Sequence, residues 1–251
     1  MKNKQYNYKK LFFLIGIFIG NSLIAQQLNM DVRDVDGNIR VYDPANINDR
    51  RSGKLTYEDM EGTPFWNEKW NPAIVYFSNN TKAKINQARL NLYTDEIHYL
   101  SANGVELAIE NQGITRLVFL NKNNLTQAIA SFAKLNNHVT GNGSAYYRVF
   151  NAGLYQLILL QKQLVKTSPY DPILGKSISS FYSKKNYAIY NEGEIIPLKD
   201  LNRVSIIGAT PNNNLIKESL KGDKTKLNNE KDVIEYLEQV NETFIKVGNK
   251  Q

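Results

Sequence analysis

The side chains best suited to acid–base or metal chemistry lie in the stretch ARLNLYTDEIHYL, residues 88–100. Asp95, Glu96 and His98 fall within four positions there, the densest group of carboxylates and imidazole in the chain. A Glu and a His can act as a general acid–base pair or supply two of the ligands of a zinc site. A metal-dependent hydrolase that uses Glu96 and His98 is therefore one hypothesis for function.

Strand geometry favours a different interpretation of these residues. Neighbours on a strand point to opposite faces, so Glu96 and His98 share one face. Asp95 fits the preceding turn, because Asp favours turns by hydrogen bonding to its own backbone. His138, the only other histidine, lies in an Asn-rich segment with no reason to be adjacent. We expect a turn and an exposed strand pair rather than a site, unless a further carboxylate or imidazole lies beside His98.

Nucleophilic catalysis has less support. The chain contains no cysteine, and no serine lies in a Gly-x-Ser-x-Gly elbow. The glycine-rich GNGS that ends at Ser144 leads into a predicted strand, whereas the elbow leads into a helix. It also lacks the lysine of a phosphate-binding loop. We therefore predict no catalytic residue, no metal and no cofactor, with Glu96 and His98 as weak candidates only.

Aromatic residues offer another kind of site. Phe65, Trp66 and Trp70 lie close together before the first predicted strand of the main domain. Tyrosine and tryptophan stack on sugars and peptides, so a glycan- or peptide-binding module on Trp66 and Trp70 is a further hypothesis. The alternative, which we favour, is that these residues belong to the core and the sheet, because β-rich folds are rich in aromatics. The three remain the candidate binding residues.

The first 25 residues have the form of a signal peptide. Four lysines precede the apolar run LFFLIGIFIG, and Ala25 is the expected last residue before cleavage. The run is shorter than the roughly 18 to 20 apolar residues of a membrane span, and a retained anchor is the alternative. Without cysteine the protein has no disulfides and no site for lipoprotein acylation. We predict export to the periplasm or the cell exterior, without stable membrane insertion after cleavage.

Loss of the leader changes the net charge. The full chain has 31 Lys and Arg against 24 Asp and Glu, a formal charge of +7. The leader contains four lysines and no carboxylate, so 27 basic and 24 acidic residues remain, a balance of +3. That balance is too small for a nucleic-acid-binding surface. We expect no nucleic-acid partner, and an unidentified protein or glycan of the cell envelope as the partner.

A polar segment, residues 26–61, follows the leader. Asp36-Gly37 in VRDVDGNIRVY predicts a two-residue hairpin turn, because such turns need positive φ at their centre. The alternative is a calcium loop formed by Asp34, Asp36, Asn38 and Asp43. With Gly37 as the loop glycine, Val32 would stand at the first ligand position, so we favour the hairpin.

Residues 62–200 are predicted to form the main domain. Short alternating or β-branched runs separated by turns such as Asn103-Gly104 predict an antiparallel meander that curls into a small barrel or roll. One interruption, Leu125 to Leu135, is predicted to be a short helix. Residues 201–251 are predicted to be helical, with Asn229 capping a helix over 230–247. Its apolar stripe is formed by Val233, Leu237, Val240, Phe244 and Val247. The expected fold class is α+β, mainly β.

Four motifs in this domain, EGTPFWNEKW, AIVYF, ARLNLYTDEIHYL and YYRVFNAGLYQLILL, together resemble a family of exported, β-rich proteins from Bacteroidota-type bacteria. Only their order is specific, since each alone is a common hairpin motif. The chain departs from the pattern at residues 91–93, where a Tyr-Asn pair is more usual, and at Trp66, which is unusually large for its place. The family has no assigned activity, so the resemblance implies export and a β-rich fold but no catalytic residue. From the sequence we expect a non-catalytic binding or structural protein of the cell envelope.

Overall fold

The computed structural model describes residues 41–42, 60–109, 113–136, 143–173, 175–210 and 226–248. Three predictions lie outside these residues: the signal peptide, the hairpin at Asp36-Gly37 with its calcium alternative, and the position of His138. None of the helices within the described ranges is long and apolar enough to cross a bilayer.

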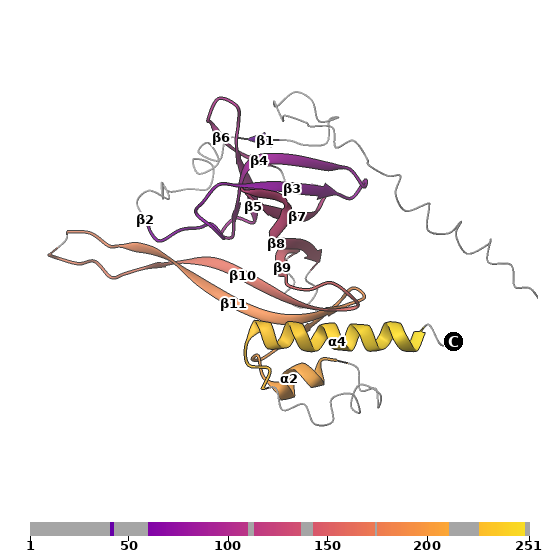
Figure 1. The fold of residues 1–251 in the computed structure, drawn as a ribbon. Coiled ribbons are helices and arrows are strands. Elements are labelled where there is room, and N and C mark those ends of the chain that lie inside the picture. Colours follow the sequence, from indigo (N-terminus) through magenta and orange to yellow (C-terminus); the bar gives the residue numbers. More distant parts are fainter. Residues whose placement is uncertain are drawn as a thin grey trace, which may run out of the picture.

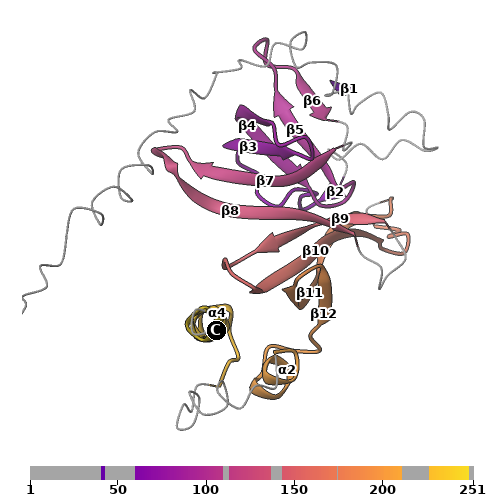
Figure 2. The same cartoon turned by 90° about the vertical axis from the view of Figure 1, so that its right-hand side faces the viewer.

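Twelve strands form one large sheet that curls without closing into a barrel (Figures 1 and 2). Its order is β1-β6-β5-β4-β3-β7-β8-β9-β10-β11-β12, and β2 pairs with β11 in parallel. The other pairings in the described part of the chain are antiparallel, which confirms the predicted mainly β fold with a helical carboxyl end. The strands are β1 (Val41–Tyr42), β2 (Met60–Glu61), β3 (Asn71–Phe77), β4 (Lys82–Asn91), β5 (Glu96–Leu100), β6 (Glu106–Ile109), β7 (Ile114–Asn121), β8 (Asn124–Asn136), β9 (Ser144–Val149), β10 (Tyr155–Thr167), β11 (Ser179–Asn191) and β12 (Glu194–Pro197).

Breaks in strand register accompany the curl. The register between β3 and β4 shifts at Asn71/Ala73, and the register between β3 and β7 shifts at Tyr76/Phe77. Two further shifts separate β7 from β8 around Leu120. An extra residue on one strand of a pair bends that strand and increases its twist. The central strands therefore curve (Figure 2). Side chains of these strands form the first core, which includes Val75, Ile97 and Phe119.

The short helix predicted from Leu125 to Leu135 is wrong, because the whole segment belongs to β8. Leu125, Ile129 and Phe132 recur at helical spacing, but they lie on a strand. In the structure β8 pairs with β7 on one side and with β9 on the other. Ala130 and Phe132 are buried, two positions apart, as expected for a strand with one face toward the core. Pairing on both sides outweighs a weak local helical pattern.

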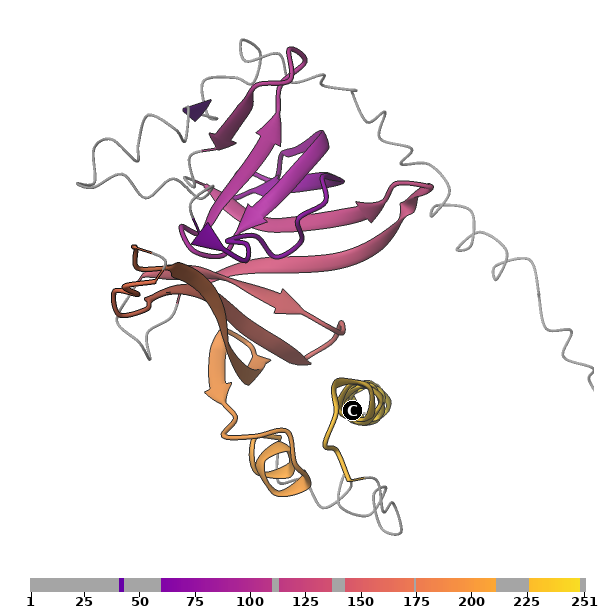
Figure 3. The same cartoon turned by 90° about the vertical axis from the view of Figure 1, so that its left-hand side faces the viewer.

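Within the described residues, α2 (Arg203–Gly208) follows β12, and α4 (Glu230–Gly248) packs against β10 (Figure 3). Both helices contribute to a second core with Leu157 and Ile189 of the sheet. The predicted start of α4 is confirmed: Asn229 Oδ1 accepts a hydrogen bond from the Asp232 amide at 3.0 Å. Of the predicted stripe, Val233, Leu237 and Val240 are buried and Phe244 is partly buried in the core beneath α4. In Figure 1 the helix runs along the inner part of the β10–β11 hairpin.

The junction between α4 and β10 is built on Asn241. Its Oδ1 accepts from the Tyr155 amide at 2.8 Å, and its Nδ2 donates to the carbonyl oxygens of Tyr155 at 2.9 Å and Ala152 at 3.2 Å. Gly153 allows this approach: an added Cβ would lie 2.4 Å from Asn241 Nδ2, and its φ is +110°. The chain therefore turns here only because Gly153 has no side chain.

The β10–β11 hairpin extends well beyond the rest of the sheet (Figure 1). Register pairs run along its whole length, from Tyr155↔Asn191 to Thr167↔Ser179. We call its outer part, residues 161–173 and 175–185, the arm. β9 pairs with β10 only at residues 158–160, so within the described residues the β9 side of the arm carries no strand beyond that point.

Candidate functional site

The β4–β5 hairpin places the predicted acidic and imidazole side chains. Asn91 Oδ1 accepts from the amides of Tyr93 at 2.9 Å and Thr94 at 3.1 Å, which forms the turn. Asp95 ends this turn with φ +59°, and β5 begins at Glu96. The prediction that Asp95 belongs to the turn while Glu96 and His98 share a strand is thus confirmed.

His98 is buried, so the expectation of an exposed strand pair is wrong. The side chain is 1% exposed, and its Nδ1 lies 2.6 Å from Glu106 Oε1 on β6. Its Nε2 lies 3.7 Å from Glu96 Oε2. Glu106 is the further carboxylate that would favour a site. It also accepts from Arg89 Nη2, at 2.9 Å to each oxygen. We call Arg89, Glu96, His98 and Glu106 the His98 network.

Three adjacent strands bring the His98 network together. Arg89 on β4 lies directly opposite His98 on β5, and Glu106 on β6 lies opposite Leu100, one diagonal step from His98. Residues opposite each other across antiparallel strands share a face, and diagonal neighbours are within reach of long side chains. The network therefore lies on one face of the sheet.

The segment before β3 covers the network. The Arg89 guanidinium carbon lies 3.8 Å from the centre of the Phe65 ring and 3.9 Å from that of Trp70. Phe65 also contacts the His98 ring edge to face, with centroids 5.3 Å apart. Such contacts of a cation with aromatic rings stabilise by about 0.5 to 2 kcal/mol each, more when water is excluded. Arg89 is thus held between two rings while it binds Glu106.

The three candidate aromatic residues do not form one surface. Phe65 and Trp70 contact Arg89, whereas Trp66 stacks on Phe119 with centroids 5.2 Å apart and packs against the first core. Phe65 is 7% exposed. Their contacts are those of core and sheet residues, which the sequence favoured over a binding platform.

Charges in the network shift the pKa values of its members in opposite directions. Burial lowers the pKa of His98, but hydrogen bonds and charges from Glu106 and Glu96 outweigh burial, and the pKa lies above its usual 6.5. Burial raises the pKa of Glu106, but His98 and Arg89 outweigh it, and the pKa lies below its usual 4.5. The arrangement therefore favours a protonated imidazole between ionised carboxylates.

A pH dependence of stability follows from the raised pKa of His98. Its protonated form stabilises the fold fully below pH 6.5, and this contribution is lost as the pH rises through the folded-state pKa. We expect the loss of unfolding free energy in His98→Gln, measured by urea titration, to be larger at about pH 6 than at about pH 9. A difference between wild type and variant that does not change over this range would contradict the protonated network.

Asp95 lies apart from the network and holds the arm instead. Its carboxylate pairs with Lys162 on β10. Lys162 lies directly opposite Lys184 in the arm, and like charges in that arrangement destabilise a sheet. Burial raises the pKa of Asp95, and the pairing with Lys162 opposes that rise. A hydrogen bond from the Gln163 amide to the Leu92 carbonyl, 3.2 Å, supports the same contact.

Sequence patterns did not point to Arg89, Glu106 or Lys162. Hairpin register could have identified Glu106 and Arg89. A turn at Asn103-Gly104 places Glu106 diagonal to His98, and the turn before β5 places Arg89 directly opposite His98. No local signal pointed to Lys162, which is 67 positions from Asp95.

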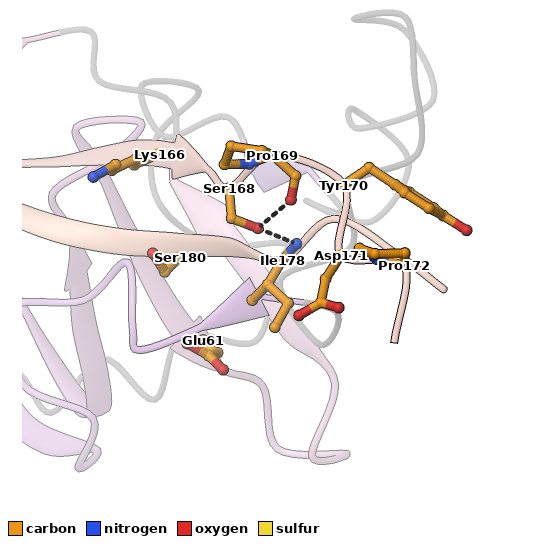
Figure 4. A pocket seen from close by; sticks show the side chains of 9 residues that line it. All are labelled: Glu61, Lys166, Ser168, Pro169, Tyr170, Asp171, Pro172, Ile178 and Ser180. Carbon is orange, nitrogen blue, oxygen red and sulfur yellow. Dashed lines mark hydrogen bonds between the residues drawn. The ribbon is translucent and has the colours of Figure 1, made fainter. Parts of the chain in front are cut away.

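A shallow hollow lies at the far end of the arm, beside β2 (Figure 4). In Figure 4 the Tyr170 ring points away from the other side chains that line it. The lining residues are Glu61, Lys166, Ser168, Pro169, Tyr170, Asp171, Pro172, Ile178 and Ser180. The hollow is formed by the turn of the hairpin and contains none of the residues of the His98 network.

Within the described ranges, no group of three or more His, Asp or Glu side chains is arranged to hold a metal ion. Comparison of the chain with protein-family models, with curated proteins and with solved structures gave no match.

Proposed function

We propose that the protein is a non-catalytic binding or structural component of the cell envelope, exported by its amino-terminal leader. One observation supports this most: the residues best suited to catalysis are engaged with each other. His98 is 1% exposed, its Nδ1 is bound by Glu106, and Phe65 covers its ring. A general base must reach the proton that it abstracts, directly or through one water. The export signal and the resemblance to exported β-rich proteins agree with the proposal.

The alternative, a hydrolase that uses Glu96 and His98, has one observation in its favour. The short contact between Glu106 and His98 is the kind of pairing that orients an imidazole base. Glu106, however, also binds Arg89 with both oxygens, so the same contact belongs to a partly buried group of ion pairs. A metal-dependent form predicts a melting temperature that rises with zinc or calcium.

The test is a turnover assay on the purified exported protein with panels of peptides, glycans and esters. We expect no turnover, and we expect His98→Ala to lower the melting temperature, because it leaves Glu106 without its buried imidazole partner and removes the ring that Phe65 contacts. Turnover that is lost in His98→Ala would contradict the proposal. Binding of a glycan or peptide, measured by titration calorimetry and lost when Trp66 and Trp70 are replaced, would assign binding to the aromatic segment instead.

A further inference from the structure

The end of the arm exposes two large apolar side chains. Ile173 is 93% exposed, more than any other large hydrophobic residue in the described part of the chain, and Tyr170 is 65% exposed. Both lie in the turn between β10 and β11, residues 168–173 and 175–178, which we call the tip. Single exposed apolar residues are ordinary on a protein surface. Here, however, the two lie three positions apart in the turn that ends the projecting β10–β11 hairpin (Figure 1).

Hydrogen bonds within the tip hold these side chains outward. The Ile173 amide donates to Asp171 Oδ1 at 2.8 Å, and the Asp171 amide donates to the Lys176 carbonyl at 3.0 Å. Ser168 Oγ accepts from the Ile178 amide at 2.9 Å and donates to the Pro169 carbonyl at 3.1 Å (Figure 4). The turn is thus closed on itself, with Ile173 and Tyr170 exposed to solvent.

The arm behind the tip is basic. Four of its lysines are exposed: Lys166, Lys176, Lys184 and Lys185. Asp171 is the only carboxylate of the arm, and its Oδ1 is engaged by the Ile173 amide. A projecting element therefore combines an apolar end with positive charge along its sides.

We propose that the tip inserts Ile173 and Tyr170 into the interface of an anionic phospholipid bilayer, with Lys176 and Lys166, the exposed lysines nearest the tip, facing the headgroup phosphates. Apolar and aromatic side chains partition into that interface, and lysines near it are attracted by its negative surface potential. A bilayer accepts a narrow projecting end. A stable protein interface needs about 1,000 Å² of complementary surface, more than two side chains supply. The inference rests on the proposed binding function and names its partner.

Insertion can be observed at Ile173 itself, because the chain contains no other cysteine to compete for a label. Ile173→Cys is labelled with a polarity-sensitive fluorophore in the exported full-length protein and mixed with vesicles of phosphatidylglycerol and phosphatidylcholine. We expect a blue shift that is absent with pure phosphatidylcholine. Val204→Cys on α2, at a position 84% exposed and outside the arm, is the matched control and should show no shift.

Two unlabelled variants separate the apolar and electrostatic contributions. In vesicle co-sedimentation, Ile173→Ser should bind about tenfold more weakly, because it removes one large apolar side chain from the bilayer interface. Lys166→Gln combined with Lys176→Gln should also bind about tenfold more weakly and reduce the salt dependence. Val204→Ser should bind as wild type. All variants have the same amino-terminal segment, so any contribution of that segment to vesicle binding is equal in all of them.

Three results would overturn the inference: no binding to anionic vesicles, equal binding to neutral ones, or full binding by Ile173→Ser. Binding of an acidic polypeptide as tight as vesicle binding would also overturn it and assign the arm to an acidic protein partner. Each of these outcomes leaves the proposed non-catalytic function standing, because that proposal is tested by substrate turnover.

Discussion

Gly153→Ala is expected to destabilise the fold more than any other single methyl addition at a described glycine. The new Cβ would lie 2.4 Å from Asn241 Nδ2 and 2.6 Å from its Cγ, where no atom fits without movement. Asn241 cannot move without loss of its three hydrogen bonds to the backbone of β10 and the preceding turn. With the strain of φ +110°, we expect a loss of about 3 to 5 kcal/mol in unfolding free energy, measured by urea titration.

Gly193 provides the matched control, since its φ of +95° is similar and no atom lies within 4 Å of an added Cβ. Gly193→Ala should cost only the backbone strain, about 1 to 2 kcal/mol. In the background of Asn241→Ala, Gly153→Ala should cost little more than that, because the clashing side chain is gone. Equal costs for Gly153→Ala and Gly193→Ala in the wild-type background would show that the approach of α4 is not limited by Gly153.

Glu106→Ala is expected to have the second largest effect. It removes the partner of two cationic groups at once, Arg89 and His98, both of which are held in place by aromatic rings. A buried charge without its partner is costly, although Glu106 is itself 34% exposed, so water screens part of the effect. We expect the unfolding free energy to fall by about 2 to 3 kcal/mol at neutral pH.

The control for Glu106→Ala is Glu235→Ala on α4. Glu235 is 59% exposed and lies 3.8 Å from Lys231, which is an ordinary surface pair. Its removal should change the unfolding free energy by less than about 0.5 kcal/mol. If both substitutions had similarly small effects, the His98 network would be a surface feature despite its burial, and the structural role of His98 would be disproved.

Local patterns predicted most strands and one helix of this fold because each is defined by its own residues. The turn at Asn103-Gly104 and the apolar stripe of α4 are local signals, and both appear where they were expected. β8 was missed because its apolar residues fit two periods, and the choice between them depends on strands that lie elsewhere in the sequence.

The site was predictable only in part for a similar reason. Glu96 and His98 were found from their spacing, and hairpin register could have added Arg89 and Glu106. The burial of His98 depends on Phe65, which lies before β3 in the chain but pairs with Asn91 at the end of β4. No periodic pattern in the sequence indicates this contact between separate segments, so the exposure of His98 was predicted wrongly.

The bond from Asn241 to Tyr155 has a consequence for the order of folding. Most strand pairs in the sheet are hairpins between consecutive segments, and such local contacts form early and at low entropic cost. Tyr155, the first residue of β10, instead donates its amide hydrogen bond to Asn241, 86 positions later in the chain. The backbone of Tyr155 therefore gains this partner only when residue 241 is present and α4 has packed against β10, so the start of β10 is completed later than the hairpins around it.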